Sequence, residues 1–285
     1  MDDGGTNRAV GLKIHQYRLV HAVAIDLESS DVLAVLMPGP SSPSAVMRVL
    51  TEGPTAVMAL PEADFTCVIR DRYTRAGSGD WVAGQYNRLL RIDDVGRMTT
   101  IAAGPPLVSI SAMIQDIHAG PGAGDFIVTS AWPHHGFEPS QSRSGLFRIH
   151  ATGVITRIHA GPPFERPAGL AQDVETGDFV VADALVPALF RVSSAGDVHT
   201  MAFGPPLTWP IAVIQDARSH DFIVLEYAKS TIPALYRVSR GGSVTPIHGG
   251  PPLQKPWSLA QDPTTGDIIV ADTEVLWRVK LASDR

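Results

Sequence analysis

Short apolar runs, separated by Gly, Pro, Ser and Asp, dominate the pattern of the chain. The clearest set lies between residues 250 and 279, where the runs read SLAQ, DIIVAD and LWRV and the turn between the first two contains DPTTGD. Runs of this length that are rich in Val, Ile and aromatic residues are typical of β-strands, and the turn residues tolerate tight reversals. Helical periodicity persists nowhere long enough to compete, so the pattern predicts an all-β protein.

The same unit returns along the chain. Residues 161–192 read GPPFERPAGLAQDVETGDFVVADALVPALFRV, residues 250–279 read GPPLQKPWSLAQDPTTGDIIVADTEVLWRV, and looser copies begin at Gly104 and Gly204. In every copy the first apolar run ends on an aspartate, a second aspartate follows a short turn, and an arginine lies in the third run. The first aspartates are Asp26, Asp71, Asp116, Asp173, Asp216 and Asp262. Four strands per unit, the fourth like 196–203, predict a six-bladed β-propeller with four-stranded blades. We interpret the repeated aspartates and arginines as architectural, because one active site needs each group once.

The two ends of the chain predict how the ring closes. Only six residues follow Val279, so the sixth copy lacks its fourth strand, and residues 11–15 resemble the fourth-strand segment 242–248. We expect the N-terminal segment to complete the last blade, which removes an open sheet edge. Residues 1–9 are then expected to form a flexible tail and residues 10–285 a single domain.

The composition of the chain limits the classes of partner that it can bind. The net charge is −6 without a block of Lys or Arg, which argues against nucleic acid. No apolar run is long enough to span a membrane, and the N-terminus lacks a secretion signal. A single cysteine, Cys67, excludes an internal disulfide. We expect a cytoplasmic protein that acts on a small organic molecule, away from nucleic acid and membranes, with no cofactor.

The order Pro-x-x-Leu-Ala-x-Asp, Gly-Asp-x-x-Val-Ala-Asp, Leu-x-Arg-Val resembles the NHL-type repeat. It is also similar to the six-bladed propellers of the senescence-marker/gluconolactonase and strictosidine-synthase-like groups. The resemblance covers about residues 11–280 and implies the fold, while the function stays open because these groups include hydrolases, lyases, ring-forming enzymes and binding scaffolds. It also implies that the fourth-to-first and second-to-third connections share the face that carries the site.

An acidic trio on that face lies at one repeat position, at the end of the second strand: Asp183, Glu226 and Asp272. One hypothesis is an acid/base cluster or a hard-cation site, since crowded carboxylates shift one another's pKa and oxygen ligands suit calcium. The alternative is structural, because NHL-type repeats often carry Asp there to hold the following loop.

The position just inside the first strand differs from copy to copy. His21 and Trp257 occupy it in the first and last copies, so ring closure would make them neighbours. Histidine suits proton transfer near neutral pH, and aromatic faces hold flat or apolar ligands. A pore-lining histidine bonded to the backbone is the alternative.

Other candidates belong to the loops of the same face. Positive side chains there suit a carboxylate, and the long segment 129–145 suits a lid. The histidines of that segment have no Cys or His partner at zinc-site spacing. The candidate binding residues are Asp64, Trp132, His134, His135, Arg166, Trp209, Tyr227, Lys255 and Trp257.

The sequence is therefore compatible with three functions. The first is an enzyme without metal or cofactor, of the lyase, cyclase or isomerase type, with His21, Asp183, Glu226 and Asp272 as acid/base candidates. The second is a module that binds a peptide, sugar or protein. The third is a calcium-dependent lactonase, but the resemblance implies metal-binding asparagines after the proline that precedes the first strand. This chain has Ala168, Ile211 and Trp257 there.

Overall fold

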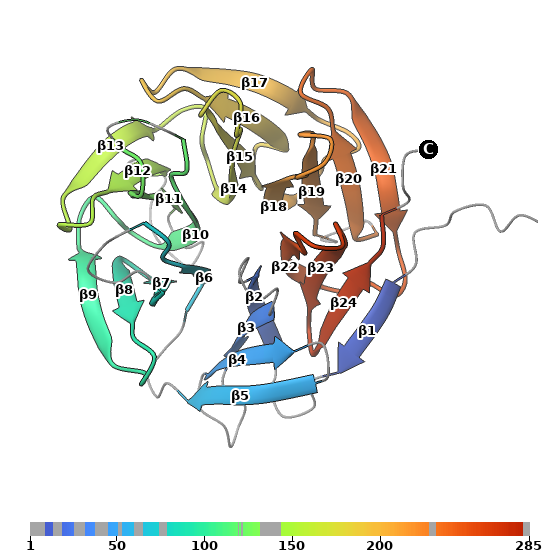
Figure 1. Ribbon diagram of the computed structural model, residues 1–285. Helices are drawn as coiled ribbons and strands as arrows, with labels where there is room; N and C mark the ends of the chain where they lie inside the picture. The colour runs from blue at the N-terminus through green and yellow to red at the C-terminus, as the bar shows by residue number, and fades with distance from the viewer. Residues whose placement is uncertain are drawn as a thin grey trace, which may run out of the picture.

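The computed structural model describes residues 9–13, 19–25, 32–37, 45–50, 53–59, 65–73, 79–118, 120, 122–131, 144–227 and 232–281. For 9–13, 19–21, 33, 37, 45–50 and 53–59 it describes the backbone alone. This part of the chain forms β-strands and no helix, arranged around a central axis (Figure 1). The predicted all-β propeller is confirmed.

The strands form six four-stranded sheets. The first three sheets are β2 (Leu19–Ile25), β3 (Val32–Met37), β4 (Ala45–Leu50) and β5 (Gly53–Ala59); β6 (Cys67–Arg70), β7 (Trp81–Gln85), β8 (Arg88–Ile92) and β9 (Met98–Ala103); and β10 (Ile110–Gln115), β11 (Phe126–Ser130), β12 (Gly145–Ile149) and β13 (Ile155–Ala160). The next two are β14 (Pro167–Gln172), β15 (Phe179–Asp183), β16 (Ala188–Val192) and β17 (Val198–Phe203); and β18 (Pro210–Gln215), β19 (Phe222–Glu226), β20 (Ala234–Val238) and β21 (Val244–Gly249).

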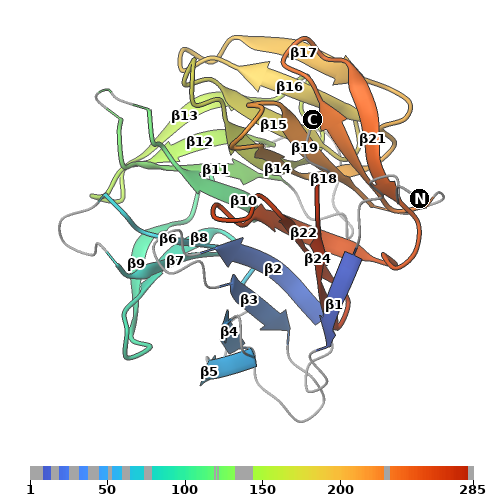
Figure 2. The same ribbon diagram turned by 45° about the vertical axis from the view of Figure 1, so that its right-hand side comes forward.

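The last sheet joins the two ends of the described chain. It contains β22 (Pro256–Gln261), β23 (Ile268–Asp272), β24 (Val275–Val279) and β1 (Ala9–Lys13). β1 pairs antiparallel with β24, with Gly11 opposite Trp277 (Figures 1 and 2). The strand begins at Ala9, two residues before the segment that its likeness to 242–248 predicts.

The core lies between neighbouring sheets. The second strand of a sheet is covered on both faces, so β11, β15, β19 and β23 are buried along their whole length. One apolar cluster joins Ile127 and Leu146 of one sheet to Phe179 and Phe190 of the next. Face-to-face packing of inward-pointing side chains thus explains the repeated FIV, FVV and IIV runs.

The repeated aspartates and arginines form ion pairs within each of the five sheets in which their side chains are described. The carboxylate of Asp173 lies 2.7 Å from Nη1 of Arg191. Four more sheets repeat this 2.7 Å pair, as Arg91–Asp71, Arg148–Asp116, Arg237–Asp216 and Arg278–Asp262. The architectural interpretation of these residues is therefore confirmed in five sheets.

A glutamine carries the same interaction across to the next sheet, which the sequence analysis missed. Gln172 donates from Nε2 to Asp116 at 2.7 Å and accepts at Oε1 from the backbone N–H of Ile117 at 2.9 Å. Gln115 repeats both bonds with Asp71 and Arg72, and Gln261 with Asp216 and Ala217. Each of these aspartates is thus bound both by its own sheet and by the following one.

Asp173 has one further partner. Nη2 of Arg240 lies 3.0 Å from its carboxylate, in addition to Arg191. Because Asp173 is fully buried beside two partly exposed guanidinium groups, removing its charge breaks two ion pairs at a buried carboxylate.

We expect Asp173→Asn to lower the free energy of unfolding by about 3 kcal/mol, the cost of breaking a buried ion pair. Asp178→Asn is the matched control, because its carboxylate lies 3.5 Å from the same arginine and is partly exposed; its loss should stay below about 1 kcal/mol. Urea denaturation measures both. Equal losses for the two variants would contradict the assignment.

The same ion pairs predict a dependence on pH. Burial would raise the pKa of Asp173, but hydrogen bonds from Arg191, the N–H of Glu175 and Arg240 outweigh it and lower the pKa from 3.8 to about 2. A depressed pKa gives stability that is present above the unfolded value and lost as the pH falls through the folded value. The stability gap between wild type and Asp173→Asn should therefore shrink between pH 3.8 and about 2. Urea denaturation across this range measures the gap, and a constant gap would count against the prediction.

Candidate functional site

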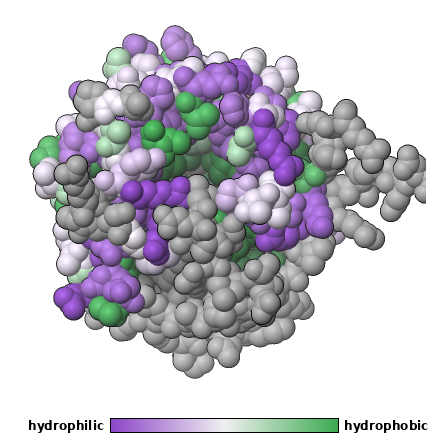
Figure 3. Space-filling view, in the orientation of Figure 1, coloured by the Kyte–Doolittle hydropathy of each residue, from purple (hydrophilic) through white to green (hydrophobic). Residues whose placement is uncertain are grey.

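The first strands of the sheets surround a cavity of about 660 Å³ on the propeller axis. Its lining runs from residues that precede the first strands, such as Ser109 and Arg166, to residues that follow them, such as Arg72 and Pro263. In the coloured part of Figure 3, apolar residues lie deep near the centre of the face, with polar residues on the surface beside and above them. This volume suits a ligand of drug-like size.

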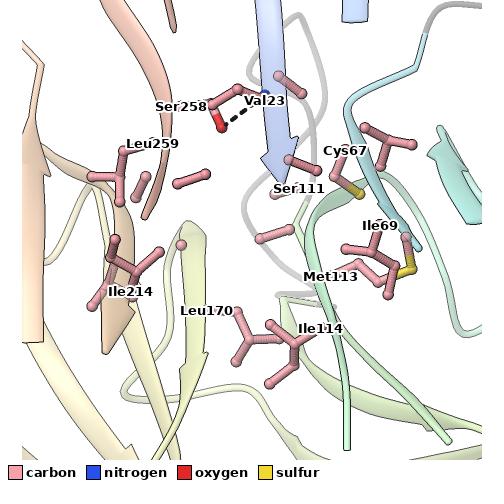
Figure 4. Close-up of a pocket in the computed structure, with 18 of the residues that line it drawn as sticks. Val23, Cys67, Ile69, Ser111, Met113, Ile114, Leu170, Ile214, Ser258 and Leu259 are labelled. Carbon is pink, nitrogen blue, oxygen red and sulfur yellow. Dashed lines mark hydrogen bonds between the residues drawn. The ribbon is translucent and has the colours of Figure 1, made fainter. Parts of the chain in front are cut away.

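The middle of the cavity is apolar. Ile69, Ile114, Leu170, Ile214 and Leu259 line it from five different strands (Figure 4). One polar contact there links the first and last sheets, since the N–H of Val23 donates to Oγ of Ser258 at 3.3 Å. Polar groups otherwise concentrate toward the two ends, so the centre suits the apolar part of a ligand.

Cys67 also lines this cavity. Burial raises the pKa of its thiol to about 12, although hydrogen bonds from Thr66 and Gly84 oppose the shift. The thiol is therefore neutral near pH 7, which agrees with a packing role and not with a nucleophile.

The charged residues of the described lining all have one sign. They are Arg70, Arg72 and Arg166, and the lining contains no Asp, Glu or His within the described residues. Arg166 stacks on Trp209 at 5.7 Å from the ring centroid. Burial lowers the pKa of Arg166, against the opposing charge of Asp183. An arginine keeps its charge after a shift in this direction, so the cavity favours anions.

Two stacked pairs form part of the rim where the first strands begin. The Arg166–Trp209 stack joins the sheets of β14 and β18. Tyr227, just after β19, lies 5.1 Å from Trp257 of β22, measured between ring centroids. Four predicted binding residues are thus brought together in two contacts, and two of them, Arg166 and Trp257, line the cavity.

The position just inside the first strand faces the cavity, as its variability suggests. Five residues at this position line the cavity: Thr66, Ser111, Ala168, Ile211 and Trp257. His21, the sixth, lies in β2, and its side chain is outside the described residues. Since Val23 bonds to Ser258, the backbones of β2 and β22 are neighbours beside Trp257.

Two members of the acidic trio hold the backbone that precedes the first strand. Asp183 is fully buried and accepts hydrogen bonds from the N–H groups of Glu165 and Arg166 at 2.9–3.0 Å. Asp272 accepts from the N–H groups of Gln254 and Lys255 at 2.7 Å. Asp183 also accepts hydrogen bonds from the N–H groups of Leu185 and Val186 at 3.0 Å, in the following loop that the structural interpretation expected. The bonds to the backbone before the first strand were not predicted, and neither carboxylate lines the cavity.

Glu226 departs from this pattern because its side chain is one methylene longer. Oε1 takes all of its hydrogen bonds, from Oγ1 and N–H of Thr208 and from the N–H of Trp209. Oε2 is buried without a partner among the described residues. Burial raises the pKa of Glu226, and the bonds from Thr208 and Trp209 only partly offset it. Of the trio, Glu226 is the member suited to hold a proton.

Four predicted residues, Asp64, Trp132, His134 and His135, lie outside the described residues, as does most of the 129–145 segment. Lys255 holds its place through its backbone N–H and does not line the cavity.

Arg70 and Arg72 are not among the residues predicted from the sequence, although a signal was present. They flank the repeat aspartate Asp71, and no other copy has a charged residue on either side of this aspartate.

In the described part of the chain, no group of three His, Cys, Asp or Glu side chains is arranged to hold a metal ion. No described helix is long and apolar enough to cross a membrane.

No family model and no curated protein matches this sequence. Solved structures match along nearly the whole chain. A gluconolactonase from Xanthomonas campestris has a TM-score of 0.74 at 16% identity, covering 97% of this chain and 90% of its own. Virginiamycin B lyase from Staphylococcus aureus has a TM-score of 0.66 at 13% identity, covering 97% and 100%. The calcium-binding protein regucalcin from Agrobacterium tumefaciens has a TM-score of 0.71 at 12% identity, covering 95% and 94%. At these identities the likeness shows the fold alone.

We expect Glu226→Gln to gain stability relative to wild type as the pH rises from 4.5 to about 8. A raised folded pKa gives stability that is present below the unfolded value and lost as the pH rises through the folded one, and glutamine avoids this loss. Asp272→Asn is the control, since both of its oxygens accept backbone bonds and it should lose stability at either pH. Thermal melts at the two pH values measure this. If the stability of the wild type relative to Glu226→Gln increased at high pH, the result would contradict the raised pKa of Glu226.

Proposed function

We propose that the protein is an enzyme that binds a small organic molecule in the central cavity and acts on it at the mouth by proton transfer. The reaction is of the lyase, cyclase or isomerase type and uses acid/base side chains. One observation carries the proposal: a cavity of about 660 Å³ opens within a uniform frame whose rim differs from sheet to sheet. A closed ring of six blades is part of this proposal, supported by the six sheets and the β1–β24 pairing.

The proposed roles follow from position. Arg166 and Trp257 bind the substrate, because both line the cavity. Trp209 and Tyr227 stack on them and fix their orientation. Lys255, Asp64, Trp132, His134 and His135 are proposed as further substrate-binding residues, and the last four lie outside the described residues.

The first candidate for proton transfer is His21, which occupies the same repeat position as the residues that line the cavity. The second is Glu226, whose raised pKa suits a general acid. Asp183 and Asp272 support catalysis by holding the rim backbone. As acid/base groups they would first have to give up these bonds.

One observation favours the second candidate, a binding module without chemistry. The described lining has no carboxylate and no imidazole, and a site that only binds needs neither. The candidates differ in whether the bound molecule changes.

The test is conversion of a small-molecule extract by the purified protein in water labelled with heavy oxygen, followed by mass spectrometry. We expect a compound to be consumed, with products that sum to its composition and carry no label. His21→Asn and Glu226→Gln should each slow this reaction at least about a hundredfold, the low end for loss of a general acid or base. Arg97→Gln, at an exposed position, should leave it unchanged.

Each of the other outcomes contradicts a different part of the proposal. A product that gains labelled oxygen indicates a lactonase-type hydrolase. A compound that is retained but unchanged indicates a binding module. Full activity of both variants would remove His21 and Glu226 from the mechanism.

A further inference from the structure

The cavity has the opposite charge to the protein that surrounds it. The chain carries 29 acidic and 23 basic residues, giving a net charge of −6. Yet every charged residue of the described lining is an arginine: Arg70, Arg72 and Arg166. A cleft lined by one sign of charge, with apolar walls of low dielectric, concentrates ligands of the opposite sign.

These arginines lie at opposite ends of the cavity. Arg166 directly precedes β14, whereas Arg70 ends β6 and Arg72 follows it. Residues that precede the first strands and residues that follow them line the two ends of the cavity, and a strand of six residues spans about 20 Å. Between the two ends the lining is apolar, at residues such as Ile114, Leu170 and Ile214. The cavity is thus an apolar channel with positive charge at both ends.

Two of these arginines lack the partners that the repeat arginines have. Arg191 and its equivalents each lie 2.7 Å from an aspartate. Arg166 stacks on Trp209 but forms no ion pair with a described carboxylate, because the nearby Asp183 accepts backbone N–H groups instead. The side chain of Arg72 has no ion pair or hydrogen bond to another described residue, since its one bond, to Gln115, is made by the backbone. A partly buried guanidinium without an ion-pair contact is stabilised by a bound anion.

We propose that the ligand of this cavity is an amphipathic organic anion. Its apolar body occupies the middle of the channel, and its carboxylate or similar group binds Arg166 at the mouth. A second anionic group at the far end of the ligand binds Arg72. The proposal names the class of ligand that the cavity binds. It shares the cavity with the proposed function and rests on it in that respect alone.

The test is calorimetric titration with four ten-carbon chains: decanoate, decanedioate, decanol and decyltrimethylammonium. Decanoate should bind about tenfold tighter than decanol, the scale of one charge-assisted contact. Decanedioate should bind tighter still, and the cation should not bind. Arg166→Gln should erase the preference for decanoate over decanol, and Arg72→Gln should erase the gain of decanedioate over decanoate. Arg97→Gln, which is exposed outside the cavity, should change neither.

The proposal is overturned if decanol binds as tightly as decanoate, if the cation binds, if no chain binds, or if the two variants keep both preferences. Melting temperatures equal to wild type show that the variants are folded. Turnover of a neutral substrate would leave the proposed function standing while this inference fails. Binding of anions without conversion of any compound would support this inference and contradict the proposed function.

Discussion

The aspartate that ends each first strand is the constraint on which the frame depends. At Asp71, Asp116 and Asp216, an arginine of the same sheet and a glutamine of the next sheet bind one carboxylate, as Arg148 and Gln172 bind Asp116; at Asp173 the second partner is Arg240. Because the glutamine also accepts the N–H of the following residue, it fixes neighbouring sheets at two points. Charge-assisted bonds at a buried position are strong and directional, so the angle between sheets repeats. This network lies at one end of the first strands and leaves the other end free to vary.

At the other end of the first strands, similar hydrogen bonds hold the backbone of the cavity rim. There, the last residue of the second strand holds the backbone that leads into the first strand, as Ser130, Asp183, Glu226 and Asp272 do. Holding the backbone through its N–H groups places no demand on the side chains of that segment. Arg166, Trp209 and Lys255 can therefore differ while their backbone positions correspond. A uniform frame and an uneven mouth follow from the same kind of bond.

The fold could be predicted from the sequence because the repeat shows both the strand pattern and its period. The cavity-facing position was also predictable, since it varies from copy to copy within a frame whose aspartates and arginines recur. The role of the acidic trio was not, because sequence position does not reveal where a carboxylate points. Asp183 and Asp272 turn to the backbone, and only the extra methylene of Glu226 leaves one oxygen without a partner. The glutamine bridges and the arginine-lined cavity also required the spatial arrangement, because they join residues of different copies.

The central claim is that the axis of the propeller is an open channel whose unmatched positive charges attract anions. A crystal structure of the protein soaked in bromide tests it most directly, because anomalous scattering locates the ion without any assumption about the natural ligand. The account predicts bromide inside the channel, at Arg166 and Arg72, with the aspartate–glutamine bridges unchanged. A channel filled by side chains, or one empty of bromide while other surfaces of the protein bind it, would contradict the account.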